Sequence, residues 1–258
     1  MSLMIILVII LTIILTVNGY SSIFEPWYHK TISRLGQEEV LTPINIDNIY
    51  NKNSGKLGKS IINYSCEPFN TSKLRYIRCV SFYGEGYDVY NFVALPWCNY
   101  DLPILGIDIV SLPGGSLAAI DFQPLVYDDA SYFQDKSYSL FAKKFNDIKA
   151  SLPLGGNMPE AAMKFFSPYA LWTRIPPNDD RMNIIEQACD TYVDAYATLL
   201  KDAKRIQDPI LLTKRQENMK IYLDYRIEND PAKNMLNGAF GVDWTKKCIK
   251  DILFPYEK

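Results

Sequence analysis

The hydrophobic pattern of residues 91–126 predicts a pair of β-strands. Two apolar runs, 104–112 and 116–125, flank a Pro-Gly-Gly turn sequence, and turn residues between two apolar runs indicate a hairpin. The proline predicts a loop rather than an ideal two-residue turn. Each run carries one carboxylate in its middle, Asp108 or Asp121. Because a carboxylate in a buried strand is costly unless it is hydrogen-bonded, protonated or in use, these two acids are the first candidates for function.

The preceding residues extend the strand pattern. Residues 74–82 and 87–95 alternate loosely between apolar and polar positions and are joined by Gly-Glu-Gly. Four consecutive strands joined by short turns favour an antiparallel sheet. Later in the chain the spacing is mainly helical, with expected helices over 131–150, 179–204, 208–228 and 233–253 and one more strand over 165–175. This order predicts an α/β fold class, either α+β or a three-layer α/β/α sandwich with an antiparallel sheet.

The N-terminal part of the chain gives a weaker pattern. Residues 23–35 predict a short helix, and the polar run 48–59 predicts a loop. Residues 3–17 are continuously apolar, but at about 1.5 Å per helical residue they are shorter than a bilayer core of about 30 Å. Small residues follow at the spacing of a signal-peptidase site. We therefore expect residues 1–19 to be a signal peptide, with a membrane anchor or a buried helix as alternatives, and residues 20–258 to form one domain.

Composition narrows the classes of function. The net charge of −2 gives no basic field for nucleic acid. The single histidine, His29, excludes histidine-rich metal sites and leaves no Ser/His/Asp or Cys/His catalytic system. The five cysteines show no CxxC spacing and indicate free buried thiols in a reducing compartment. No dinucleotide, flavin or iron–sulfur motif is present, so the sequence predicts no bound cofactor or metal. Acid-assisted chemistry on a ligand, or ligand binding without chemistry, remains.

Asp108 is the acid best placed for such chemistry. Because side chains alternate across a sheet, Gly106, Asp108 and Val110 share one face. A carboxyl group in an apolar pocket can keep its proton near neutral pH and donate it to a bound ligand. The neighbouring glycine leaves room for a flat ligand to approach. The alternative is a core aspartate that backbone donors satisfy, and the spacing alone favours this alternative.

Three further residues are candidates with structural alternatives. Asp121 lies near a strand end, where a turn or cap contact is common. Asp230 precedes Pro231 between two expected helices, which favours a helix N-cap. Arg174 follows an aromatic run. It could bind a carboxylate in a bidentate manner or form a surface ion pair.

Ordered motifs along residues 73–258 resemble those of the ferredoxin-dependent bilin reductases. They are Asn-Tyr-Asp-Leu-Pro-Ile-Leu-Gly-Ile-Asp at 99–108, Asp-Phe-Gln-Pro-Leu-Val at 121–126, Phe-Ser-Pro at 166–168, Trp-Thr-Arg at 172–174, Asn-Asp-Pro at 229–231, Phe-Gly-Val-Asp-Trp at 240–244 and Leu-Phe-Pro at 253–255. Each motif alone is weak. Their number and their order make the resemblance specific.

This resemblance implies a three-layer α/β/α sandwich with a central antiparallel sheet. A linear tetrapyrrole, biliverdin IXα or a partly reduced bilin, would bind between the sheet and the C-terminal helices. Members of the family hold no cofactor. Electrons arrive singly from the [2Fe–2S] cluster of reduced ferredoxin, and protein acids give protons to radical intermediates. The implied partners are ferredoxin, the bilin and a second bilin reductase, with no nucleic acid, and the chain is expected to be a monomer.

The resemblance also assigns roles to individual residues. Asp108 matches the sheet aspartate that donates a proton, and Asp230 matches a second acid on the helix side. Arg174 matches an arginine that pairs with a bilin propionate. Gly106 and Asp121, the neighbours of these residues in the motifs, are expected to contribute to substrate binding.

Two departures from the family pattern bear on the product. Asn91 stands where phycocyanobilin-forming members have a catalytic histidine, and Cys79 or Val80 stands where they have a sheet glutamate. These departures argue against four-electron reduction to phycocyanobilin. Asn91 itself is expected to bind the substrate.

The motifs divide between two branches of the family. The sequence at 121–126 resembles most closely the branch that makes 15,16-dihydrobiliverdin, whereas residues 164–174 resemble the phytochromobilin synthases, which reduce the A-ring. The resemblance predicts two-electron reduction of biliverdin IXα at the C15–C16 methine bridge. The alternatives are A-ring reduction to phytochromobilin or phycoerythrobilin, four-electron synthesis of phycoerythrobilin, and bilin carriage without turnover. Together with the apolar N-terminus, the resemblance indicates the stroma of a secondary plastid.

Ferredoxin is an acidic protein, so we expect a basic docking surface. The candidates are Lys143, Lys144, Lys204, Arg205, Lys214 and Arg215. The alternative is that these residues lie on ordinary solvated helix faces.

Overall fold

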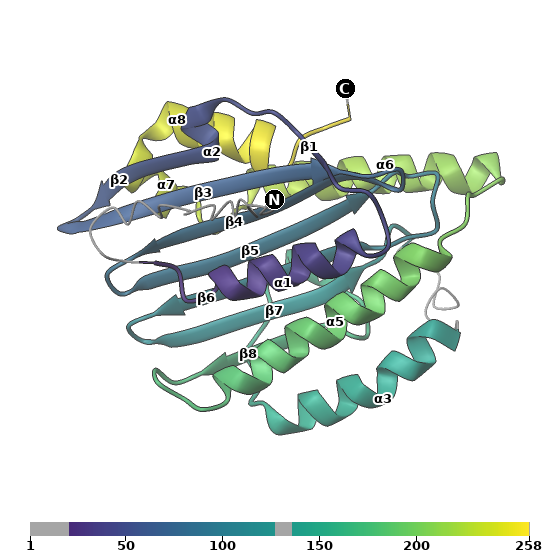
Figure 1. Ribbon diagram of the computed structural model, residues 1–258, viewed down its shortest axis with the longest axis horizontal. Helices are drawn as coiled ribbons and strands as arrows, with labels where there is room; N and C mark the ends of the chain where they lie inside the picture. Colours follow the sequence, from purple (N-terminus) through teal and green to yellow (C-terminus); the bar gives the residue numbers. More distant parts are fainter. Residues whose placement is uncertain (1–20, 127–135, 258) are drawn as a thin grey trace, which may run out of the picture.

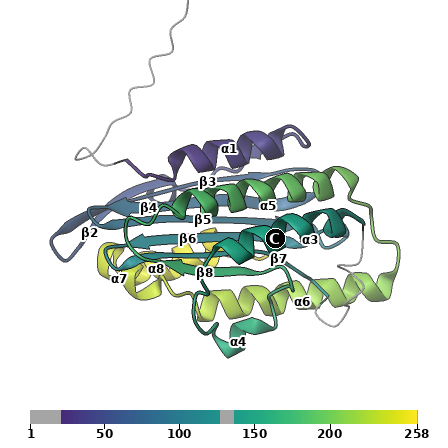
Figure 2. The same ribbon diagram turned by 90° about the horizontal axis from the view of Figure 1, so that it is seen from below.

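An antiparallel sheet of eight strands forms the middle layer of the protein in the computed structural model, which describes residues 21–126 and 136–257. Neighbouring strands follow the order β1-β3-β4-β5-β6-β7-β8, and β2 also pairs with β3. Helices cover both faces of the sheet (Figures 1 and 2). The predicted α/β/α sandwich with a central antiparallel sheet is confirmed.

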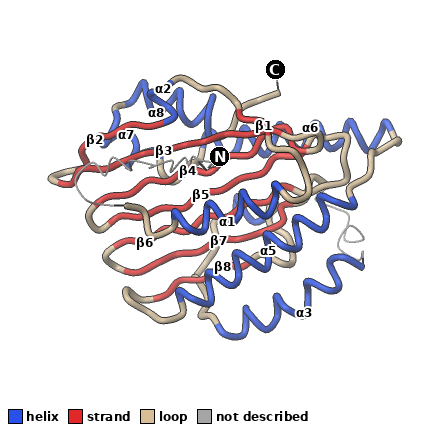
Figure 3. The backbone as a smooth tube through the Cα atoms, in the orientation of Figure 1, coloured by secondary structure: helices blue, strands red, loops and turns tan. Residues whose placement is uncertain are grey.

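The elements follow each other along the chain as drawn in Figure 3. The strands are β1 (Thr42–Pro43), β2 (Lys52–Leu57), β3 (Ser60–Asn70), β4 (Leu74–Gly84), β5 (Tyr87–Pro96), β6 (Ile104–Leu112), β7 (Gly115–Gln123) and β8 (Leu171–Ile175). The helices are α1 (Glu25–Gly36), α2 (Asn48–Asn51), α3 (Lys136–Ser151), α4 (Glu160–Met163), α5 (Met182–Asp202), α6 (Pro209–Glu228), α7 (Lys233–Phe240) and α8 (Val242–Lys247), followed by the π-helix η3 (Cys248–Leu253).

The hairpin of β6 and β7 is tighter than the sequence predicts. Leu112 pairs directly with Gly115, so only two residues form the turn, and the expected longer loop is wrong. Gly115 has φ +124°, a value that strains any residue with a Cβ. Glycine at the first strand position therefore permits the short turn despite the preceding proline.

Three other expectations need correction. The polar run 48–59 is not a loop, because it forms α2 and the edge strand β2, which hydrogen-bonds to β3 along its whole length. Of residues 165–175, only the last five form a strand. The expected helix 233–253 divides at Gly241, whose φ of +88° ends α7. The start of the expected helix 131–150 lies outside the described residues.

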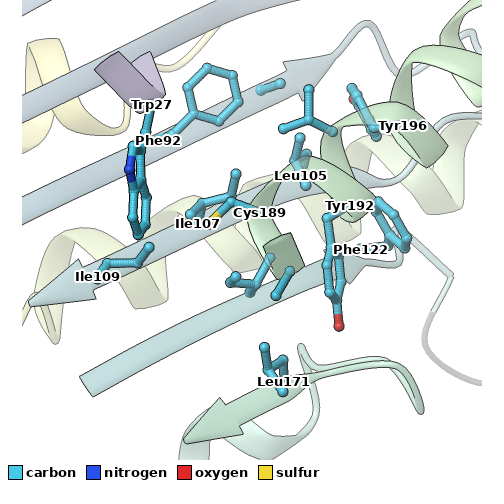
Figure 4. Close-up of a cluster of buried hydrophobic side chains, with 14 of the residues drawn as sticks. Trp27, Phe92, Leu105, Ile107, Ile109, Phe122, Leu171, Cys189, Tyr192 and Tyr196 are labelled. Carbon is cyan, nitrogen blue, oxygen red and sulfur yellow. The ribbon is translucent and has the colours of Figure 1, made fainter. Parts of the chain in front are cut away.

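Each face of the sheet has its own apolar core, because helices cover both. One core lies under α1, α3 and α5 (Figure 4), and its labelled side chains are Trp27, Phe92, Leu105, Ile107, Ile109, Phe122, Leu171, Cys189, Tyr192 and Tyr196. The other lies between the sheet and α6, α7 and η3. Central strands with two buried faces carry apolar residues at consecutive positions, which explains the loose alternation of β4 and β5.

The cysteines agree with the prediction of free buried thiols, since all five are buried and unbonded to one another. Burial raises the pKa of Cys66 and of Cys248 to about 12, so both thiols stay protonated. His29 is exposed. Across residues 21–126 and 136–257, no helix has the length and apolar character needed to cross a bilayer. The predicted signal peptide, residues 1–19, lies outside the described residues.

Candidate functional site

The register of the central strands brings the predicted site residues together on one face of the sheet. Asn91 of β5 is the cross-strand partner of Asp108 of β6. Gly106 of β6 is the partner of Asp121 of β7. The same rows include Val80 of β4, which pairs with Asn91. Because side chains alternate along each strand, all five face the layer formed by α6 and α7.

Two adjoining cavities of about 220 Å³ each lie on this face. Asn91, Asp108, Arg226 and Pro231 line both cavities and mark their junction. The remaining walls are mainly apolar and include Tyr64, Val80, Phe82, Met235 and Leu253 in the first cavity and Ala119, Phe166, Trp172 and Tyr222 in the second. Together they reach the size of about 300–1,000 Å³ that holds a compact organic ligand. The site is therefore mainly apolar, and two of its charged groups, Asp108 and Arg226, lie at the junction of the two cavities.

Asp108 makes its hydrogen bond within the cavity. Asn91 Nδ2 donates to Asp108 Oδ1 at 2.8 Å. The partner is a side chain that also lines the cavity, rather than the backbone donors that a core role predicts. Behind it, the fully buried Arg78 donates to the Asn91 carbonyl oxygen at 2.8 Å and to Asn91 Oδ1. Asp108 is thus held on one side and faces the cavity.

Asp230 lies on the opposite wall, between α6 and α7. Its Oδ1 accepts a hydrogen bond from Ala232 N at 2.8 Å. The predicted N-cap is wrong in detail, because α7 begins only at Lys233 and Asp230 forms a turn before it. Burial raises the pKa of Asp230, and the charge of Asp108 adds to this rise, while Arg226 opposes it. A carboxyl group in this position holds its proton more tightly than an exposed aspartate does.

Two arginines near these acids, Arg226 and Arg78, were not predicted from the sequence as site residues. Arg226 lines both cavities, and its Nε is buried without a hydrogen-bond partner among the described residues. The guanidinium carbons of Arg226 and Arg78 each lie 5.2 Å from the centre of the Phe254 ring. Sequence spacing gave no signal for Arg226, because α6 ends at Glu228 and Asp230 lies beyond the helix. The signal for Arg78 was a charge within a mainly apolar strand, although Arg75 on the same strand carries the same signal.

Asp121 makes a structural contact, but it is a long-range contact rather than the turn or cap contact that the sequence predicted. It is buried and accepts hydrogen bonds from Ser167 N at 2.8 Å and from Ser167 Oγ. These bonds hold the segment before β8 against β7, in place of the strand predicted there. Asp121 also lines the second cavity, and its part in substrate binding stays a prediction.

Asp121 should make the stability of the protein depend on pH. Burial raises the pKa of this carboxyl from 3.8 to about 7, although the bonds from Ser167 oppose the rise. Between these values the folded protein binds more protons than the unfolded chain, so stability from this group is complete below pH ~4 and is lost as the pH rises through ~7. The shift corresponds to about 4 kcal/mol. Asp121→Asn keeps the shape and cannot ionise, so we expect the variant to lose less stability than the wild type between pH 5 and pH 8.

Urea unfolding at both pH values measures this difference. Asp180→Asn is the control, because Asp180 is exposed. Parallel pH curves for the wild type and Asp121→Asn would contradict the expectation.

Within the described residues, no three His, Cys, Asp or Glu side chains form a group able to hold a metal ion.

Residues 29–255 match the family model of the ferredoxin-dependent bilin reductases. The chain belongs to this family. It is an enzyme, a ferredoxin-dependent bilin oxidoreductase.

Relatives of this bilin reductase share most of its length. The phycoerythrobilin:ferredoxin oxidoreductase of Nostoc punctiforme is 35% identical over 243 residues, which cover 92% of this chain and 94% of the relative. The protein of the same name from Parasynechococcus marenigrum is 38% identical over 196 residues, 73% of each chain. The solved structure of tomato phytochromobilin synthase in complex with biliverdin covers 90% of this chain and matches over 82% of its own, with a TM-score of 0.82 at 24% identity. This likeness shows that the fold is shared.

The geometry of the bilin reductase also places the remaining predicted residues. Val80 lines the first cavity, whereas Cys79 belongs to the core on the opposite face, so Val80 occupies the position where a glutamate could reach a ligand. Arg174 pairs with Leu117 across β7 and β8 and is exposed on the cavity side of the sheet, outside the lining of either cavity. A Cβ at Gly106 would lie 3.5 Å from Gln123 Oε1, an ordinary contact. The roles of Gly106 and Arg174 in substrate binding stay predictions.

One of the six basic residues proposed for ferredoxin docking is excluded. Arg215 is 1% exposed and donates to the carbonyl oxygens of Cys98, Tyr100 and Leu102 at 3.0, 2.6 and 2.7 Å. A buried side chain cannot contact a partner. Lys143, Lys144, Lys204 and Arg205 are exposed, and their role in docking stays a prediction.

Proposed function

We propose that this bilin reductase reduces the A-ring of 15,16-dihydrobiliverdin and forms phycoerythrobilin. The observation that carries this choice of product is the similarity, at 35–38% identity, to relatives named phycoerythrobilin:ferredoxin oxidoreductase. Asn91 and Val80, which replace the histidine and glutamate expected of a phycocyanobilin-forming enzyme, also agree with this product.

The two acids on facing walls suit a bilin held between them. Each turnover adds two electrons, one at a time from two reduced ferredoxins, and two protons to the bilin. Asp108 approaches the ligand from the sheet, and Asp230 approaches it from the turn between α6 and α7. Each one-electron step leaves a negative charge on the conjugated system, which a nearby carboxyl group neutralises by giving its proton. The two carboxylates then regain protons from solvent.

Burial prepares Asp230 for this role. A donor works best when its pKa lies near the working pH, and burial moves the pKa of Asp230 upward from its ordinary range. Arg226, beside both acids, prevents two ionised carboxylates from facing each other without a counter-charge after the protons have left. The apolar walls exclude water, which protects radical intermediates from side reactions.

Reduction at the C15–C16 bridge of biliverdin IXα is the second candidate function. The Asp-Phe-Gln-Pro-Leu-Val motif favours it, because this motif resembles the branch that makes 15,16-dihydrobiliverdin. Saturating a methine bridge shortens the conjugated system, so this reaction would shift bilin absorption strongly to shorter wavelength. A-ring reduction of 15,16-dihydrobiliverdin leaves the methine bridges as they are.

Anaerobic incubation with reduced ferredoxin decides between the two. We expect 15,16-dihydrobiliverdin to be converted to phycoerythrobilin, identified by chromatography beside authentic standards, and biliverdin IXα to give little or no 15,16-dihydrobiliverdin. Conversion of biliverdin IXα to 15,16-dihydrobiliverdin, with added 15,16-dihydrobiliverdin left unchanged, would establish the second candidate. Recovery of both bilins unchanged would leave a bilin carrier.

A further inference from the structure

We propose that Arg78 is a positioning residue that acts through Asn91 and determines which oxygen of Asp108 holds the transferable proton. The inference rests on the proposed role of Asp108 as a proton donor. The three side chains form a continuous series of hydrogen bonds on the cavity face. Arg78 Nη1 donates to Asn91 Oδ1, and Asn91 Nδ2 donates to Asp108 Oδ1 at 2.8 Å.

The guanidinium fixes the orientation of the amide. The two ends of an asparagine side chain have nearly the same shape, but one end accepts and the other donates. An arginine side chain has donors only, so Asn91 must turn its oxygen toward Arg78 and its nitrogen toward Asp108. The bond from Arg78 Nη1 to the Asn91 carbonyl oxygen, at 2.8 Å, holds the guanidinium at this position along the strand.

The orientation of the amide determines where the proton of the acid can be. The N–H group of Asn91 Nδ2 donates to a lone pair of Asp108 Oδ1, so this oxygen is an acceptor whether or not the acid is protonated. The proton therefore sits on Oδ2, the oxygen that Asn91 leaves free. Asp108 can lose and regain this proton without any rotation of Asn91, and the amide does not titrate near neutral pH as an imidazole would.

A purely structural role explains Arg78 less well. Its side chain is 0% exposed, its Nε donates to the Leu253 carbonyl oxygen at 3.0 Å, and its Nη2 is buried without a partner among the described residues. A buried donor left unpaired costs about 1–3 kcal/mol, and a well-packed apolar side chain often matches or exceeds the stability of a buried charge. Arg78 is absent from the lining of both cavities. It acts on the site only through the groups it binds, of which Asn91 is the one that touches Asp108.

A double-mutant cycle tests the inference. The variants are Asn91→Leu, Arg78→Met and the double variant. One readout is the single-turnover rate of 15,16-dihydrobiliverdin reduction with reduced ferredoxin. The other is the absorption spectrum of bound biliverdin. Since a positioned acid contributes about 10²–10⁴ to rate, we expect each single variant to be at least ~10-fold slower, with the biliverdin Kd changed less than about threefold. The double variant should be no slower than Asn91→Leu, because the effects of residues that act as one unit do not add.

The spectrum of bound biliverdin gives a readout that does not depend on turnover. Because the proton of Asp108 faces the ligand, we expect Asn91→Leu, Arg78→Met and the double variant to shift the bilin band in the same direction and by similar amounts. Arg78→Lys keeps a donor near Asn91 and should recover part of both the rate and the spectrum.

Arg75 offers a matched control. It is also buried on β4, and its Nη1 donates to the Pro255 carbonyl oxygen at 3.0 Å, so Arg75→Met disturbs the C-terminal segment without touching Asn91. Its effect should multiply with that of Asn91→Leu. Multiplying effects of Arg78→Met and Asn91→Leu, or a wild-type rate and spectrum in Asn91→Leu, would overturn the inference.

The outcomes separate this inference from the proposed function. A wild-type protein that binds biliverdin but reduces no bilin overturns the proposed function, and the spectra of the variants then decide the inference alone. If circular dichroism shows that Arg78→Met is unfolded, the spectra of bound biliverdin in Asn91→Leu and Arg78→Lys decide the inference, and a wild-type spectrum in Asn91→Leu overturns it.

Discussion

Replacing Asp108 with Asn lowers the turnover rate at least ~100-fold while bilin binding is retained. The reason is that a positioned proton donor contributes about 10²–10⁴ to rate, and an amide of the same shape has no proton to give. Asp108 lines both cavities and bonds to the side chain of Asn91, so the variant keeps its contacts. Single-turnover kinetics with reduced ferredoxin measure the rate, and absorption titration measures the Kd for bilin.

Asp88→Asn is the control for the loss of one carboxylate from the sheet. Asp88 lies on the neighbouring strand β5 but points to the opposite face, where it binds Ser22 Oγ at 2.7 Å and Ile23 N at 2.7 Å. Its replacement should leave the turnover rate within about twofold of the wild type. Unchanged turnover in Asp108→Asn would remove this residue as a proton donor and leave Asp230 and Asp121 as the remaining acids that line the cavities.

Replacing Arg215 with Met destabilises the protein by about 3–5 kcal/mol, the range expected when several buried polar groups lose their partner at once. Arg215 joins α6 to the segment before β6 through three backbone carbonyl groups. Methionine fills a similar volume but leaves all three acceptors buried without a donor. Urea unfolding followed by circular dichroism measures the loss as a lower midpoint at an unchanged slope.

Arg205→Met is the matched control, because Arg205 contacts the same segment from the surface. Its Nε donates to Tyr100 Oη at 3.3 Å, and its side chain is exposed. A surface contact of this kind should change the free energy of unfolding by less than about 1 kcal/mol. An equally small change in Arg215→Met would mean that the three carbonyl groups find other donors in the folded state.

The sequence predicts the strands that carry the site better than the pairing that completes it. Alternation along one strand was sufficient to place Gly106 and Asp108 on the same face, as the structure shows. It could not reveal that Asn91 is the direct partner of Asp108, because register depends on contacts between strands. Asp230 reaches the same site from a segment more than a hundred positions later, and only the resemblance to a family connected the two acids.

The errors share a physical cause, which is that local patterns do not report contacts made at long range. The polar residues of β2 read as a loop because an edge strand has few apolar positions, and its hydrogen bonds to β3 supply the order instead. Arg215 resembled a surface charge within an expected helix, and it was therefore proposed as a docking residue. Its burial depends on carbonyl groups 113–117 positions earlier, which no local window includes.

The π-helix η3 follows all the described strands of the sheet along the chain, so the ribosome makes it after them. Its carbonyl groups at Ile252 and Leu253 accept hydrogen bonds from Tyr76 and Arg78, which are made about 175 residues earlier. The strands of the sheet precede η3 along the chain, and N-terminal segments fold first during synthesis. The two hydrogen bonds to Ile252 and Leu253 can form only after η3 has been made. A nascent chain therefore has the strands of the sheet before it has Leu253, which lines the first cavity.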